Sequence, residues 1–248
     1  LKSSTLKNSD DFPADFKTEE ITQTFEYVQP YYDRIEREFY GFKTVRTLRP
    51  DGTILESEYA NRDYRLQGVQ LASRVIETGK DSQSNDKLLI ETLNNIEPEE
   101  RYTDSANDMA RESCLADLGY PLKQLANETA KQNRITPCDI WFAKPTETIT
   151  RWYEGEEHPV ETAVIYEKYD AYGNVVRFRD KQNFEDPDDD LVALIIYDDR
   201  PELMDQHIVD HPVSIDVREG IREGTSEEEV SESGKTVRYR SGSYDEKG

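Results

Sequence analysis

The sequence predicts a mainly β protein built from antiparallel hairpins and meanders. Apolar and polar residues alternate with a period of two, as in residues 20–27, where Ile21, Phe25 and Tyr27 share one face. The chain also holds 15 Tyr, 8 Phe and 2 Trp, although only 35% of its residues are hydrophobic. Such aromatic side chains are typical of sheet surfaces, and a disordered acidic chain would not carry so many.

The first part of the chain predicts a meander. The run 33–46 keeps Ile35 and Phe39 in phase and then shifts across Gly41, which indicates a bulge at that glycine. Pro50-Asp51-Gly52 predicts a hairpin turn, because Pro presets φ and Gly accepts a positive φ. The strands expected here span residues 20–27, 33–46, 45–48, 54–59, 69–78 and 87–94.

The segment 98–137 differs in character. Residues 106–133 lack β-branched runs and contain many Ala and Leu, and Gly119-Tyr120-Pro121 interrupts them. This pattern favours a short helical insertion, with an irregular surface insertion as the alternative. The only cysteines, Cys114 and Cys138, are expected to be independent thiols, and one bridge between them is the alternative.

Strand patterns return in the last part of the chain, where Tyr172-Gly173-Asn174 predicts a tight turn. The expected strands span residues 140–143, 147–153, 161–169, 175–179, 191–197, 213–217 and 235–240. The predicted organisation is therefore a lead-in at 1–18, a β region at 19–97, an insertion at 98–137 and a second β region at 138–248.

Charge excludes several classes of function. The formal net charge is −22, which disfavours nucleic-acid binding because no basic patch is available for phosphates. No apolar run approaches the roughly 20 residues that a membrane helix needs, so we expect no membrane insertion by this segment.

Candidate catalytic and metal-binding residues do not form a convincing site. Carboxylate pairs such as Glu36 with Glu38, or Glu154 with Glu156, would share one face of a strand as in a glycosidase, but acidic strands produce this spacing by chance. His207 and His211 have helical metal-ligand spacing, yet Pro212 would end the helix. The acidic residues of 186–190 are expected to form a solvated loop, with Ca²⁺ binding as the alternative. We therefore predict no enzyme activity, no catalytic residue, no cofactor and no metal.

The aromatic side chains of the strands leave one further alternative. Trp141, Trp152, Tyr153 and Tyr166 are expected to pack in a core or a cavity wall. They would otherwise stack on sugars, as in an extracellular carbohydrate-binding or adhesion module.

Two segments share the form Tyr-Asp-x-x-Gly. One is Tyr169-Asp170-Ala171-Tyr172-Gly173, followed by Asn174, and the other is Tyr244-Asp245-Glu246-Lys247-Gly248. This pattern resembles the YD (Rhs) repeat, whose pentad makes a hairpin turn in a long coiling sheet.

A second resemblance lies in Tyr31-Tyr32-Asp33-Arg34-Ile35-Glu36-Arg37-Glu38-Phe39-Tyr40-Gly41-Phe42. It is similar to a segment that precedes the YD repeats in toxin-complex B subunits and plasmid-virulence-type proteins, except that Tyr40 replaces the usual Arg. Residues 59–68, 71–78 and 149–155 extend the likeness, which covers most of 20–180.

The resemblance implies a noncatalytic structural section of a hollow β shell, or cocoon, that encloses a toxic polypeptide and helps to deliver it. The implied partners are the remainder of the shell, the encapsulated C-terminal toxin and a translocation or injection apparatus. Such a protein would be made in the bacterial cytoplasm and delivered outside the cell, and we expect its repeats to continue beyond residue 248. The implied structural residues are Tyr32, Asp33, Glu36, Arg37, Phe39, Gly41, Phe42, Tyr169, Asp170, Gly173, Asn174, Tyr244, Asp245 and Gly248.

Overall fold

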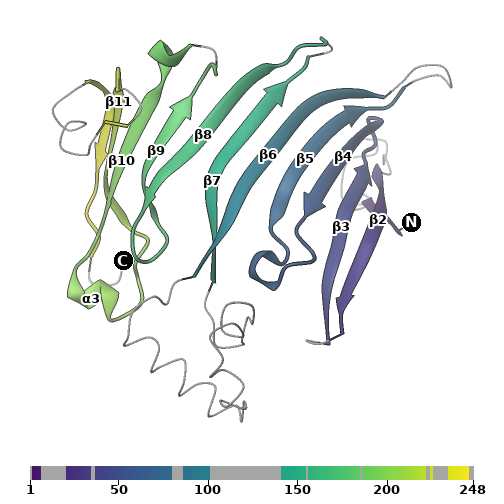
Figure 1. Ribbon diagram of the computed structural model, residues 1–248, viewed down its shortest axis with the longest axis horizontal. Coiled ribbons are helices and arrows are strands. Elements are labelled where there is room, and N and C mark those ends of the chain that lie inside the picture. Colours follow the sequence, from purple (N-terminus) through teal and green to yellow (C-terminus); the bar gives the residue numbers. More distant parts are fainter. Residues whose placement is uncertain are drawn as a thin grey trace, which may run out of the picture. The chain divides into compact units, whose positions relative to one another are not determined.

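The computed structural model describes residues 2–6, 21–34, 37–79, 86–100, 141–154, 156–184, 186–221, 224–225 and 234–245. In this part of the chain, twelve strands form one antiparallel sheet whose strand order follows the sequence (Figure 1). The strands are β1 (Lys2–Leu6), β2 (Ile21–Asp33), β3 (Glu38–Leu48), β4 (Thr53–Tyr59), β5 (Gln70–Glu77), β6 (Lys87–Glu100), β7 (Trp141–Trp152), β8 (Val160–Tyr169), β9 (Val175–Lys181), β10 (Leu191–Tyr197), β11 (Pro212–Glu219) and β12 (Lys235–Ser241). The predicted mainly β fold is confirmed.

Among the described residues, three single-turn helices lie between strands: η1 (Tyr64–Leu66), η3 (Pro187–Asp189) and α3 (Pro201–Met204). Residues 198–211, where α3 lies, carry no predicted strand or helix. None of the described helices is long and apolar enough to cross a membrane.

The chain divides into two compact units, residues 1–96 with 145–248, and residues 97–144. The described part of the second unit consists of the ends of β6 and β7, where Lys144 Nζ donates to Glu99 Oε2 at 2.7 Å. The helical stretch predicted within 98–137 lies outside the described residues, apart from the three residues that β6 contributes, and so do Cys114 and Cys138.

The N-terminal lead-in holds a strand that the sequence analysis did not predict. β1 pairs with β2 from Lys2 opposite Phe25 to Leu6 opposite Ile21. A strand of five residues with two serines and little alternation gives a weak sequence pattern.

The hairpin predicted at Pro50-Asp51-Gly52 is confirmed. Leu48 lies opposite Ile54, and the Gly52 amide donates to the carbonyl of Arg49 at 3.0 Å. Gly52 has a φ of +85°, which a side chain would disfavour. The turn thus sets the register of β3 and β4.

The bulge predicted at Gly41 is also confirmed. Tyr31 lies opposite Gly41 and Tyr32 opposite Phe39, so Tyr40 is the extra residue of β3. The prediction of one strand over 33–46 is wrong, because the chain reverses between Asp33 and Glu38, with Arg37 at a φ of +57°. Expected strands at 140–143 and 147–153 are likewise one strand, β7, which continues through Pro145.

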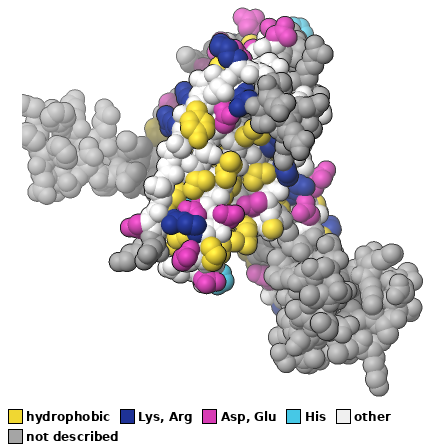
Figure 2. Space-filling model, turned by 90° about the vertical axis from the view of Figure 1, so that its left-hand side faces the viewer, with side chains coloured by type: hydrophobic (Ala, Val, Ile, Leu, Met, Phe, Trp, Pro, Cys, Tyr) yellow, Lys and Arg dark blue, Asp and Glu magenta, His cyan; other side chains and the backbone are white. Residues whose placement is uncertain are grey.

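The buried core of the described sheet is small. Val192 and Ile221 form its hydrophobic cluster, with Leu194 packed against them, and Leu203 of α3 is buried separately. Most other sheet residues are half-buried. Figure 2, seen from the side on which Figure 1 draws β10 and β11, shows hydrophobic side chains lying among charged ones. Polar contacts must therefore supply much of the specificity of the sheet.

Candidate functional site

A row of charged side chains crosses seven consecutive strands, from β2 to β8, and alternates in sign at every step. Each member forms an ion pair with the next, at nitrogen-to-oxygen distances of 2.7 to 3.6 Å. We call this row the charge ladder. Its members in strand order are Glu26, Arg46, Glu56, Arg74, Glu91, Arg151 and Glu161.

The ladder depends on strand register. Arg46, for example, lies directly opposite Glu26 on one side and Glu56 on the other. A slip of one residue would move a whole strand's side chains to the other face and break its pairs. The ladder therefore specifies the alignment of strands that have little apolar core to align them.

The centre of the ladder is less exposed than its β2 end. Burial raises the pKa of the Glu56 carboxyl, but the guanidinium groups of Arg46 and Arg74 outweigh this and hold that pKa below its ordinary value. Hydrogen bonds from Arg151 to Glu161 and Glu91 likewise raise the pKa of Arg151. Both shifts favour the charged forms of Glu56 and Arg151, the forms that pair in the ladder.

A second cluster of charges is formed by Arg177 and Arg179 of β9, Glu167 of β8, and Asp190, which precedes β10. Both arginines and Asp190 are buried. Arg179, 1% exposed, contacts Glu167 at 3.0 Å and Asp190 at 3.4 Å, and donates to the carbonyl of Ile221 at 2.6 Å. Arg177 pairs with Glu167 and donates to the carbonyl of Thr225 at 2.9 Å. These two guanidinium groups anchor the chain that follows β11.

Three Tyr-Asp dipeptides close the hairpins β7–β8, β9–β10 and β11–β12. In each case the Tyr hydroxyl donates to a backbone carbonyl of the hairpin's first strand. The pairs are Tyr169 with Pro145 at 2.6 Å, Tyr197 with Val175 at 3.2 Å, and Tyr244 with Pro212 at 3.1 Å. We call these three sites the Tyr-Asp corners.

The Asp of a corner turns the chain out of the strand. Asp170 Oδ1 accepts hydrogen bonds from the amides of Tyr172 and Asn174, at 2.8 and 2.9 Å, and Asp198 accepts one from the amide of Arg200 at 3.2 Å. Gly173 completes the first turn with a φ of +93°. Such side-chain caps satisfy amides that the sheet leaves unpaired.

The corners also contact more distant segments. Asn174 donates to the carbonyl of Val209 at 2.6 Å, and Arg200 to the carbonyl of Tyr244 at 2.9 Å. Burial, with the carboxylates of Asp170 and Asp210, raises the pKa of Tyr197, so its hydroxyl remains a donor.

Tyr197 and Asp198 were missed by the sequence analysis. The full pentad requires a Gly four residues after the Tyr, and Pro201 stands there instead. The Tyr-Asp dipeptide at the end of a predicted strand is the sequence feature that could have identified this corner.

The N-terminal motif surrounds the bulge of β3. Phe39 and Phe42 lie edge to face with ring centres 5.4 Å apart, and Tyr32 is exposed. Asn61, which the sequence analysis did not select, is buried and donates to the carbonyls of Gln29 at 3.0 Å and Gly41 at 3.3 Å. Asn61 thus links the backbone of β2 at Gln29 to the bulge of β3 at Gly41. Glu36 and Gly248 lie outside the described residues.

The alternative chemical sites do not assemble in the described part of the chain. It holds no group of three or more His, Cys, Asp or Glu side chains arranged to bind a metal ion. His207 follows α3 in a turn with a φ of +60°, and Asp186 caps η3 through the Asp188 amide. The expected strand placement of Glu154 and Glu156 is wrong, because Glu154 follows β7 in a turn with a φ of +45°.

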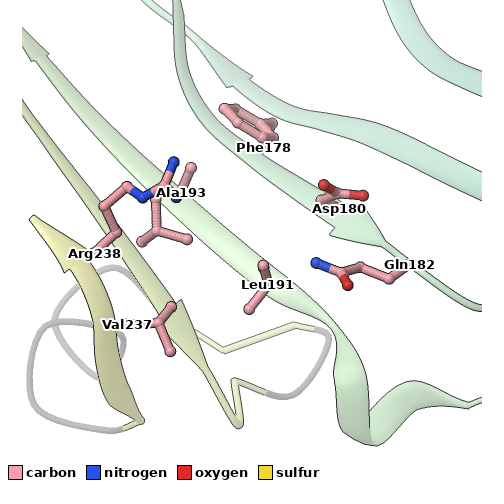
Figure 3. A pocket seen from close by; sticks show the side chains of 8 residues that line it. Phe178, Asp180, Gln182, Leu191, Ala193, Val237 and Arg238 are labelled. Carbon is pink, nitrogen blue, oxygen red and sulfur yellow. The ribbon is translucent and has the colours of Figure 1, made fainter.

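An apolar groove of about 410 Å³ lies on one face of β9 to β12 (Figure 3). The residues that line it include the apolar Phe178, Ala193 and Val217 and the charged Asp180 and Arg238. Burial and the carboxylates of Asp189 and Asp190 raise the pKa of Asp180. Among the described residues that line the groove, one is acidic and one is basic, and none is Ser, Thr, Cys or His.

The sheet has strictly sequential strands, and Tyr-Asp corners close three of its hairpins, the arrangement expected from the resemblance to YD repeats. Comparison with known proteins gives the more particular likeness. Residues 12–72 match the family model described as the insecticide toxin TcdB middle/N-terminal region. No curated protein matches the sequence significantly.

Solved structures of toxin complexes share the fold. They include TcdB2-TccC3, with 12% identity and a TM-score of 0.51, TcdB2-TccC3-Cdc42, with 13% and 0.50, and the Photorhabdus luminescens Tc holotoxin pore, with 12% and 0.52. Each match covers 80% of this chain and only 12% of the other. The chain is similar to the shell-forming region of toxin-complex B-type proteins.

Proposed function

We propose that this chain is a noncatalytic structural section of an Rhs/YD-repeat shell that encloses a toxic polypeptide and helps to deliver it. The observation that carries the proposal is the sequential sheet with its three Tyr-Asp corners. The likeness of fold to the toxin complexes and the match at residues 12–72 support it.

Physical features of the sheet suit a wall. In the described part of the chain, neither face of the sheet carries a continuous hydrophobic core. The charge ladder aligns the strands without such a core. In a wall with water on at least one side, polar side-chain pairs between strands must set the strand register. The motif residues selected from the sequence then act as structural residues of bulges and corners.

The partners follow from the same proposal. They are the remainder of the shell, the toxic polypeptide enclosed by it, and a translocation or injection apparatus. The protein would be made in the bacterial cytoplasm and act outside the cell. We further propose that residues 19–97 and 138–248 form the wall and that residues 98–137 are an insertion in it.

Protease protection tests the proposal. The longest natural polypeptide that contains this chain should protect a C-terminal cargo from proteinase K, and removing all three corner hydroxyls, Y169F/Y197F/Y244F, should speed digestion of the cargo. Replacing the exposed Tyr239 by Phe is the matched control, since Tyr239 is 60% exposed and makes no corner. Equal digestion of the cargo with and without the shell would contradict the proposal.

A second candidate is an extracellular carbohydrate-binding or adhesion module. Exposed aromatic rings favour it, since Tyr27 contacts Phe42 at 4.9 Å between ring centres and Trp152 is also exposed. Binding on a glycan array that Tyr27→Ala abolishes, together with unprotected cargo, would support this candidate over the shell.

A further inference from the structure

One of the two edge strands of the described sheet, β12, differs from the rest of the chain in charge. Its sequence, KTVRYRS, contains three cations and no acid, whereas the whole chain has a net charge of −22. All seven residues of β12 are exposed, and β11 is its one neighbour in the described sheet. An edge strand of this kind presents backbone groups that another strand can pair with.

Two of the three cations have no acidic residue directly opposite them on β11, the one strand that pairs with β12. Lys235 pairs with Glu219 at 2.8 Å, but Arg238 and Arg240 lie opposite the apolar residues Val217 and Ile215. Among the described residues, neither arginine forms an ion pair. The Arg238 side chain instead lies over the apolar groove toward Ala193 (Figure 3).

The charge ladder shows one arrangement of arginines in this sheet. Arg46, Arg74 and Arg151 each lie between carboxylates from both neighbouring strands. Because β11 offers Arg238 and Arg240 only apolar partners, carboxylates can reach them in the same manner only from beyond β12.

We propose that the outer edge of β12 pairs with an antiparallel strand that carries two carboxylates, two residues apart, opposite Arg238 and Arg240. Identifying this strand as the next strand of the shell rests on the proposed function, whereas the chemistry of the edge does not. The residue between the two acids would lie opposite Tyr239, on the other face of the sheet, where aromatic and β-branched side chains pair well.

A second copy of this chain does not fit the same edge. Antiparallel pairing of β12 with itself would bring Lys and Arg side chains of both copies together on a solvent-exposed ribbon, and like charges that oppose each other are destabilising. The basic edge therefore disfavours self-association and favours an acidic strand.

The test uses the 248-residue chain and labelled peptides as long as β12. An acidic peptide with Glu at two alternate central positions should bind about tenfold more tightly than the same peptide with Lys there, as measured by fluorescence anisotropy. R238E/R240E should reverse this preference. The control R49E/K87E makes the same change in net charge on β6 and in the β3–β4 turn, and should leave the preference intact.

A third peptide separates strand pairing from simple charge attraction. It keeps both Glu residues but carries N-methyl groups on alternate amides, which removes main-chain donors, and it should lose binding. Equal binding of the acidic and basic peptides, undiminished binding of the methylated peptide, absence of binding, or dimerisation of the chain through β12 would each overturn the proposal. These results do not depend on cargo protection, so the edge and the shell can fail separately.

Discussion

The charge ladder of β2 to β8 and the buried cluster of β8 and β9 use the same two groups, guanidinium and carboxylate, in different surroundings. At the β2 end of the ladder the Arg46 and Glu26 side chains are 47% and 51% exposed, whereas the Arg179 side chain of the cluster is 1% exposed. Water and salt weaken the first kind of pair, and burial makes the second costly to disturb.

The difference shows two uses of charge in one sheet. The ladder distributes many weak contacts over seven strands and specifies register. The cluster concentrates its contacts on two guanidinium groups that hold the backbone at Ile221 and Thr225 against the sheet. The first should therefore respond to solution conditions and the second to single substitutions.

Removal of the buried guanidinium should have the largest effect. Arg179→Met leaves Asp190 and the Ile221 carbonyl without this donor in a buried site, and we expect a loss of about 3–5 kcal/mol in the free energy of unfolding. Urea denaturation measures it, with Arg74→Met in the ladder as the matched control. If Arg179→Met loses no more free energy of unfolding than Arg74→Met, the buried cluster does not contribute more per arginine than the ladder.

Loss of one corner hydroxyl should have an intermediate effect. Tyr197→Phe keeps the ring and removes the donor to the Val175 carbonyl, which should cost about 0.5–1.5 kcal/mol. Tyr239→Phe, on exposed β12, should cost nothing measurable in the same denaturation series. If both variants lose the same amount, the corner hydrogen bond does not contribute to stability.

The ladder should show a smaller effect that depends on salt. Arg74→Met removes contacts with Glu56 and Glu91, for a loss of up to about 1 kcal/mol at low ionic strength. Near 1 M NaCl the Debye length falls to about 3 Å, so this loss should shrink while that of Arg179→Met persists. If the loss in free energy of unfolding does not depend on salt in either variant, salt does not screen the ion pairs of the ladder.

Local sequence patterns predicted most strands, the Pro50 hairpin and the Gly41 bulge, because each depends on a few adjacent residues. The β1 strand could not be predicted in this way, since its partner lies about twenty residues away and its own alternation is weak. The turn at Arg37 was also missed, because a positive φ at a non-Gly residue leaves no clear mark in the sequence.

The candidate site was predicted in part. The Tyr169 corner follows from a known pentad, but Tyr197 and Asp198 become visible as a corner only when the Val175 carbonyl is seen beside the hydroxyl. The charge ladder depends on register between strands that are up to 60 residues apart, as for Arg151 and Glu91. No local periodicity contains this information.

The smallest effect concerns pH and the centre of the ladder. Because the folded protein holds the pKa of Glu56 below its ordinary value, the unfolded chain binds more protons as the pH falls below about 5. The stability that this carboxylate contributes is complete above its unfolded pKa and is lost as the pH falls through its folded pKa.

Glu56→Gln should therefore be less stable than the parent at pH 7 and should approach it in denaturation series toward about pH 3. Glu157→Gln, in an exposed loop, should differ little from the parent across the range. A deficit for Glu56→Gln that stays constant with pH would mean that packing around Glu56, rather than its charge, accounts for its contribution.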